Sequence, residues 1–162
     1  LYILENYIGQ GKEAAAATIS VMSVITMIVG LIGSIGSGAI SDWIGRRKLP
    51  VIVASILLAV GYFLPWIMKS ASSMMLFAGF AGLGYAVYGA VDQALNVDVL
   101  PSKEEAGKDL GILNIATTLG QMVGPIVTSV LVIAGGYNLV FPTAIAFAIV
   151  ACIFIQLIRS TK

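Results

Sequence analysis

The chain has 162 residues, of which 59% are apolar and 10% charged, with a formal net charge of +1 at pH 7. A soluble domain of this size would expose too much apolar surface, so the composition predicts a membrane protein. With one cysteine and no histidine, the chain offers neither a disulfide framework nor a histidine or cysteine metal site, and we expect no cofactor.

Five apolar runs are each long enough to cross about 30 Å of hydrocarbon at a rise of about 1.5 Å per residue. They cover about residues 14–41, 49–68, 72–97, 110–134 and 139–158. Residues 1–8 look like the tail of a preceding helix, so we expect a fragment that begins inside a helix. Because backbone groups in lipid must be bonded within their own segment, the sequence predicts one all-α domain, an antiparallel transmembrane bundle over residues 1–162.

Lysine and arginine residues are distributed unevenly over alternate connections. One side of the membrane collects Arg46, Arg47, Lys48, Lys103, Lys108, Arg159 and Lys162, and the other only Lys12 and Lys69. Since cytoplasmic loops carry the excess of cations, we expect the loops at 42–49 and 98–109 and the C-terminus to be cytoplasmic. The predicted location is the cell membrane, with several crossings.

The spans differ in polarity. The second and fifth spans contain almost no polar residues, which favours a position for both on the outer flank of the bundle. Small residues recur on the first span at a spacing of three and four, which predicts a close-packing or sliding surface: Ser20, Ser23, Thr26, Gly30, Gly33, Ser34, Ser37 and Gly38. Close helix contact, rather than a nucleotide loop, accounts best for the glycines of the third span: Gly79, Gly82, Gly84 and Gly89.

Polar stripes on the third and fourth spans are the best candidates for a hydrated path for substrate or ion. They comprise Tyr85, Tyr88, Asp92, Gln93 and Asn96 on the third span, and Asn114, Thr118, Gln121, Pro125 and Thr128 on the fourth. The tyrosines could stack on a sugar ring, although a structural role is favoured for them. Asn114 and Gln121 could hydrogen-bond substrate hydroxyls, and bonding between helices explains them almost as well.

Asp92 is the single residue that points most strongly to function, because placing an ionisable group inside a membrane span costs free energy. It precedes Asp98 by six residues, about 9 Å at helical rise, and so lies below the cytoplasmic end of its span. Two interpretations stand side by side. Asp92 either caps a neighbour or pairs with Arg46 as a structural or gating acid, or it takes part in proton coupling or substrate binding.

A short charged hinge separates the first two spans. Gly38 allows close helix approach, Asp42 is expected to close the first helix, and Gly45 permits a tight reversal before three cations. This pattern of Gly38, Asp42, Gly45, Arg46, Arg47 and Lys48 resembles the cytoplasmic signature loop of major facilitator superfamily transporters. Trp43 stands where the family usually has a basic residue, as in the weaker copy of the loop between the eighth and ninth helices. The resemblance therefore points to the C-terminal half, with the five spans similar to helices eight to twelve.

The resemblance implies a gating set formed by Gly38, Asp42, Gly45, Arg46, Arg47 and Asp98. Asp42 would face the N-terminus of the fourth span, and Arg46 would pair with Asp98 or, as second candidate, Asp92. The third span would line a central cavity between moving walls formed by the first and fourth. Residues 93–101 and 107–116 also look like the corresponding part of sucrose and other glycoside-type carriers.

These observations predict a secondary active transporter that works by alternating access on a small solute, driven by protons or sodium and handling sugars. Its other expected partners are the lipid bilayer and the missing N-terminal half, with no nucleic acid. A drug or metabolite exporter of the same superfamily is the alternative, and a non-transporting scaffold or receptor is a further one. No constellation of nucleophile, base and oxyanion donors is visible in the sequence, so we expect no enzyme.

Overall fold

A computed structural model of the protein describes residues 1–44, 48–98 and 106–157. Inside its helices, the side chains of residues 38–44, 48, 91–98, 106 and 155–157 lie outside the description. The described ranges contain helices and no strand, which confirms the all-α fold. The helices are α1 (Tyr2–Asn6), α2 (Lys12–Ile44), α3 (Lys48–Ile67), α4 (Ala71–Asp98), α5 (Ala106–Gly135) and α6 (Tyr137–Leu157).

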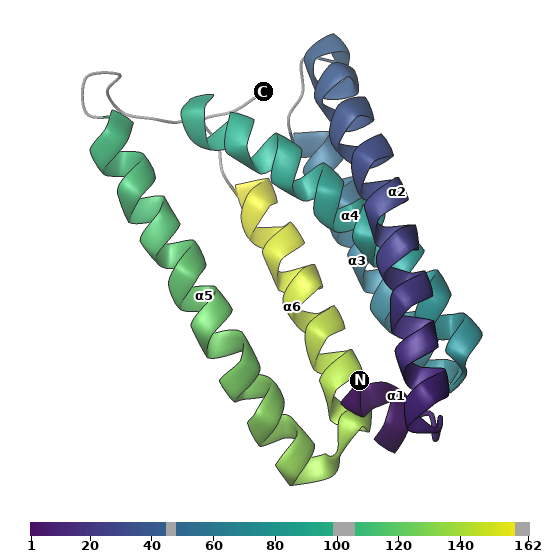
Figure 1. Cartoon of the computed structure of the whole chain (residues 1–162). Helices are drawn as coiled ribbons and strands as arrows, with labels where there is room; N and C mark the ends of the chain where they lie inside the picture. The colour runs from purple at the N-terminus through teal and green to yellow at the C-terminus, as the bar shows by residue number, and fades with distance from the viewer. Residues whose placement is uncertain (45–47, 99–105, 158–162) are drawn as a thin grey trace.

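The five helices from α2 to α6 are long and apolar enough to cross a membrane. Their bounds lie close to the predicted spans, and the largest difference is at the start of α5, which begins at Ala106 rather than at residue 110. Successive helices run in opposite directions (Figure 1). The C-terminal ends of α2 and α4 therefore lie at one end of the bundle, and α1 lies at the other.

α4 contacts α2 on one side and α3 on the other, and α3 also contacts α6. α5 has α6 as its main neighbour and stands apart from the remaining helices (Figure 1). The expected outer position of the second span is therefore only half right, because α3 packs between two helices. Its other face is apolar and exposed at a helical spacing of three and four, as lipid contact requires: Val53, Ile56, Val60, Phe63 and Ile67.

Glycines bring α2 and α4 together. A Cβ atom on Gly82 of α4 would lie 3.1 Å from Val29 Cγ2 and 3.3 Å from Thr26 Cγ2 of α2. A Cβ atom on Gly33 of α2 would lie 2.9 Å from Leu83 Cδ1 of α4. In lipid, helix association depends on such packing rather than on hydrophobic burial, so these positions hold α2 against α4.

The contact between α3 and α4 is closer still. A Cβ atom on Gly84 would lie 2.8 Å from the Ala54 carbonyl oxygen and 3.1 Å from the Leu58 backbone nitrogen. On the α3 side, a Cβ atom on Gly61 would lie 3.0 Å from the backbone nitrogen of Ala81. Because two of these three neighbours are backbone atoms of one helix and the third is backbone of the other, neither side can yield by changing a rotamer.

The predicted small-residue stripe of α2 only partly coincides with its packing face. Gly33 and Ser37 are buried, as predicted, whereas Ser20, Ser23 and Ser34 are exposed. The exposed hydroxyls lie on a different side of α2 from the face that meets α4. They are therefore free of tight packing against the described helices.

Three connections at the α1 end follow turn chemistry that the sequence carries. Gly9 (φ 80°) lies in the link between α1 and α2, and Gly136 (φ 74°) separates α5 from α6; both adopt the left-handed conformation that favours glycine. The Gly136 N–H donates to the Val132 carbonyl at 2.9 Å. At the start of α4, the backbone N–H groups of Ser70 and Ser73 donate to each other's hydroxyl oxygens at 3.4 and 3.2 Å, which is reciprocal capping.

At the opposite end, the connections are shorter than the predicted loops 42–49 and 98–109. α2 continues past Asp42 to Ile44, so Asp42 does not close the helix as expected. α3 begins at Lys48, and Pro50 lies in its first turn, where a backbone N–H has no partner inside the helix in any case. Likewise, residues 106–109 belong to the first turn of α5 instead of to a loop.

We expect Gly84→Ala to lower the free energy of unfolding by about 1–3 kcal/mol, because the added methyl group overlaps backbone of α3. Gly89→Ala is the matched control in the same helix, since a Cβ atom there meets nothing within 4 Å. Denaturant titration of both variants in detergent measures the difference. Equal stability of the two variants would contradict the close contact at Gly84. The sequence-based expectation that Gly89 also makes a close helix contact is wrong among the described neighbours.

Candidate functional site

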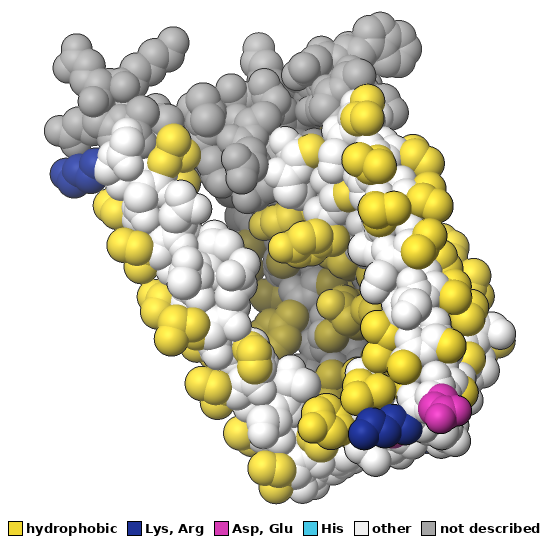
Figure 2. Space-filling view, viewed as in Figure 1, with side chains coloured by type: hydrophobic (Ala, Val, Ile, Leu, Met, Phe, Trp, Pro, Cys, Tyr) yellow, Lys and Arg dark blue, Asp and Glu magenta, His cyan; other side chains and the backbone are white. Residues whose placement is uncertain are grey.

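One face of the molecule is hollowed between α5 and the pair formed by α2 and α4 (Figure 2). The outer edge of α5 carries hydrophobic side chains, whereas its side toward the hollow is largely without them. On α2 and in the floor of the hollow, hydrophobic side chains are visible as well. The hollow is therefore bordered by the less apolar side of α5 and by surfaces of mixed character opposite it.

α5 has three faces. Toward α6 it presents residues that line a cavity of about 400 Å³ between the two helices, among them Gly120, Val123, Gly124, Val127 and Leu131. A second face is apolar and exposed: Ile112, Leu119, Ile126 and Val130. The third carries the predicted polar stripe, with Asn114, Thr118 and Gln121 exposed. At 100° per residue, these three residues point away from both other faces. Thr128, predicted as part of the same stripe, instead lines the cavity toward α6.

Hydroxyl groups on α5 bond to their own helix. The Thr118 hydroxyl donates to the Asn114 carbonyl at 2.8 Å, and the Thr128 hydroxyl donates to the Gly124 carbonyl at 3.0 Å. Such bonds occupy the threonine donors and leave the carboxamides of Asn114 and Gln121 as the exposed groups that both donate and accept. These two amides are the polar groups of α5 best suited to a hydroxylated ligand.

α4 carries Tyr85 and Tyr88 on the side opposite to Leu83 and Val87. Leu83 and Val87 line an apolar groove shared with α2 and α3, which fixes the outer side of α4. Tyr85 is 68% exposed on the other side, and Tyr88 is partly buried. The exposed ring of Tyr85 is therefore the aromatic surface that α4 offers.

Three further predicted path residues, Asp92, Gln93 and Asn96, lie on α4, with side chains outside the description. The helix places Asp92 one turn beyond Tyr88 and six residues before the end of α4 at Asp98. The predicted gating side chains lie outside the described ones as well: Gly38, Asp42, Gly45, Arg46, Arg47 and Asp98. Their pairings stay predictions.

Tyr7 joins three helices at the other end of the bundle, a contact that the sequence analysis missed. Its hydroxyl donates to the Trp66 carbonyl at 3.3 Å, and the Lys69 ammonium lies 4.6 Å from its ring centroid. Its ring centroid lies 5.4 Å from that of Phe141 and 6.3 Å from that of Tyr137, both on α6. Tyr7 therefore ties the end of α1 to the end of α3 and the start of α6.

Burial raises the pKa of the Tyr7 phenol, so the hydroxyl remains a donor at neutral pH. One sequence signal could have indicated the cluster, because Trp66 and Tyr137 lie at helix ends on one side of the membrane, where aromatic residues gather. Which aromatic rings meet depends on how the helices pack. That information is absent from each segment taken alone.

Within the described part of the chain, no group of three or more His, Cys, Asp or Glu residues is placed to hold a metal ion. The exposed polar groups described on α4 and α5 are amides, hydroxyls and a phenol ring. Such groups can bind and orient a solute by hydrogen bonding and stacking. They are the candidate binding groups of these two helices.

The fold defines a multi-pass membrane protein whose helix α5 carries an exposed polar face. The family model described as Major Facilitator Superfamily matches residues 1–162. The chain belongs to the Major Facilitator Superfamily, a family of membrane transporters. Neither a curated protein nor a solved structure matches it.

If the stripe on α5 faces water, a cysteine at Gln121 should react with a membrane-impermeant thiol reagent. Leu119→Cys is the matched control, because position 119 is 54% exposed and lies on the opposite, apolar face only two residues away. Both variants are made in a Cys152→Ala background, which removes the natural thiol. We expect labelling at 121 at least about tenfold faster than at 119, since thiolate forms poorly in hydrocarbon. Equal rates would contradict a hydrated stripe.

The contact between Tyr7 and Lys69 should be measurable by a double-mutant cycle. Combining Tyr7→Leu with Lys69→Met is expected to give a coupling of about 0.5–1 kcal/mol in the free energy of unfolding. Lys12→Met, at the same end of the bundle, replaces Lys69→Met in the control cycle and should give no coupling. A coupling free energy of zero in both cycles would show that the contact between Lys69 and Tyr7 contributes nothing to stability.

Proposed function

We propose that the protein is a secondary active transporter that moves a small solute by alternating access. The observation that carries this proposal is the polar face of α5, with exposed Asn114 and Gln121, in a membrane-spanning bundle whose α4 exposes the ring of Tyr85. Polar groups facing lipid are unfavourable, so this face needs water, a solute or another polar surface against it.

The proposed substrate is a hydroxylated solute of the sugar or glycoside type. Amides that donate and accept together with an aromatic ring suit a sugar, whose hydroxyls need both kinds of partner and whose ring face stacks on tyrosine. The likeness of residues 93–101 and 107–116 to glycoside-type carriers supports the same class. We assign Tyr85, Tyr88, Gln93, Asn96, Asn114 and Gln121 to this path.

Asp92 is the proposed site of coupling to a proton or sodium gradient. Asp92 follows Tyr88 by four residues on α4 and precedes the end of the helix by about 9 Å. A carboxylate at this depth changes its interactions when it binds a proton or a cation, and either event can favour one of two conformations. Protons are the favoured ion.

The proposed orientation places the ends of α2 and α4 in the cytoplasm, at the cell membrane, because that side carries most of the cations. The proposed partner across the hollow is the N-terminal half of the transporter. In this arrangement, Asp42 and Arg46, with Gly38, Gly45, Arg47 and Asp98, regulate closure at the cytoplasmic side.

An exporter of drugs or metabolites is the second candidate, because it would use the same hinge. Hydrophobic side chains also lie in the floor of the hollow (Figure 2), and such a lining suits a lipophilic cation better than a sugar. Competition separates the two functions, since glycosides would inhibit a sugar carrier and lipophilic cations would inhibit an exporter. A non-transporting scaffold or receptor would respond to neither.

Uptake of labelled sucrose and maltose into vesicles under an imposed pH gradient tests the proposal on the full-length transporter. In Asp92→Asn, we expect gradient-driven uptake to fall at least about tenfold, because an amide cannot take up a proton at neutral pH. Glu13→Gln is the control, since this exposed acid lies in the first turn of α2, away from the path.

A second assay separates the possible roles of Asp92. Exchange of labelled for unlabelled sugar without a gradient should persist in Asp92→Asn if the residue couples protons, and should be lost if it binds sugar. Unchanged gradient-driven uptake would assign Asp92 to structure. Uptake of neither sugar by the wild type would favour the exporter or the scaffold.

A further inference from the structure

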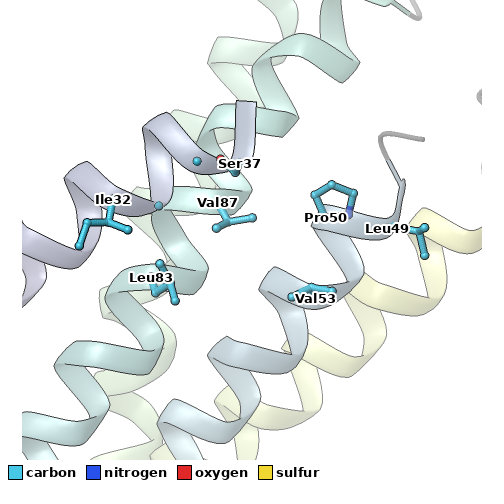
Figure 3. Close-up of a pocket in the computed structure, with 9 residues that line it drawn as sticks. Ile32, Ser37, Leu49, Pro50, Val53, Leu83 and Val87 are labelled. Atoms are coloured by element: carbon cyan, nitrogen blue, oxygen red, sulfur yellow. The ribbon is translucent and has the colours of Figure 1, made fainter. Parts of the chain in front are cut away.

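An apolar groove lies where α2, α3 and α4 meet, on the side of α4 away from the hollow (Figure 3). Its volume is about 340 Å³. The side chains of Ile32, Leu83 and Val53, one from each helix, point into it, and Leu49 and Pro50 border it at the start of α3. We propose that this groove binds an acyl chain of a membrane phospholipid.

The residues that line the groove favour an apolar ligand. Its one hydroxyl belongs to Ser37, which is 7% exposed and donates to the Ser34 carbonyl of its own helix at 3.5 Å. No other side chain among the described lining residues can form a hydrogen bond. A polar solute would therefore lose its bonds to water here without replacing them.

The groove is continuous with the lipid-facing surface of the protein. Leu49 and Val53 line it and are 44% and 52% exposed, and Val53 begins the apolar stripe of α3 that ends at Ile67. Ile32, on the facing wall, is 64% exposed. An acyl chain lying along α3 thus reaches the groove without leaving the hydrocarbon region.

Glycine at positions 33 and 36 makes the groove. Gly33 lets Leu83 approach α2, whereas a Cβ atom on Gly36 would meet nothing within 4 Å. The space over Gly36 is therefore open rather than filled by a neighbour. Left empty, the groove would deprive its lining of van der Waals contacts, and an acyl chain restores them.

Charge favours a phospholipid at this end of the bundle. The groove lies beside the N-terminus of α3, whose helix dipole attracts anionic groups. In the sequence, Arg46, Arg47 and Lys48 separate α2 from the body of α3. A lipid phosphate at the level of the headgroups is therefore favoured near the start of α3 while one of its chains lies in the groove.

Photo-crosslinking tests the proposal. The full-length transporter is placed in phosphatidylcholine vesicles containing a phosphatidylcholine with a diazirine in one acyl chain, and adducts are mapped by mass spectrometry. We expect labelling of residues 49–53 to exceed labelling around Ile112 of α5 by about fivefold. Ile112 is 57% exposed at the same end of the bundle and represents ordinary lipid contact. A packing preference of about 1 kcal/mol corresponds to this ratio.

Gly36→Leu fills the groove and should abolish the excess at 49–53 without changing labelling around Ile112. Gly30→Leu is the matched control in the same helix, because a Cβ atom at Gly30 also meets nothing within 4 Å but Gly30 does not line the groove. Val53→Phe fills the groove from α3 and should act like Gly36→Leu. Equal labelling of the two regions in the wild type, or an excess that survives both filling variants, would overturn the proposal.

Discussion

The near-contact of α4 with α2 and α3 is the constraint on which the described structure depends. Hydrophobic burial does not draw helices together in lipid, so their association depends on how closely the backbones approach. Gly82 and Gly84 provide that approach on the two sides of α4. With α4 fixed between two neighbours, one of its remaining sides exposes the ring of Tyr85 and the other carries Leu83, which lines the apolar groove.

The helices and their alternating directions could be predicted from the sequence because each follows from a local property. Hydrophobic length predicts a span, and the parity of the spans predicts which ends lie together. The exact ends were harder, because residues 42–44 and 106–109 were assigned to loops although α2 and α5 extend through them. Local chemistry permitted both interpretations.

Packing between helices was less predictable. The glycines at 82 and 84 were correctly assigned to close contact, but the same reasoning failed for Gly89 and for the exposed serines at 20, 23 and 34. A stripe of small residues shows where a neighbour could approach and not whether one does. The cluster around Tyr7 was missed for a related reason, since it joins residues up to 134 positions apart (Tyr7 and Phe141) that have no signal in common. The polar stripe of α5 was found because helical periodicity alone defines it.

The Gly136 turn has a consequence for biosynthesis. It joins α5 and α6 so tightly that the two helices form a hairpin, which a translocon can release into the bilayer as one unit. Inserted alone, α5 would carry the cost of Asn114 and Gln121 in lipid, and its mean hydropathy of 1.6 is lower than the 2.0 of α6. As a hairpin, the pair shares one insertion free energy, and the apolar α6 compensates for the polar groups of α5. The shortest connection in the described chain thus permits the more polar helix of this pair to enter the membrane.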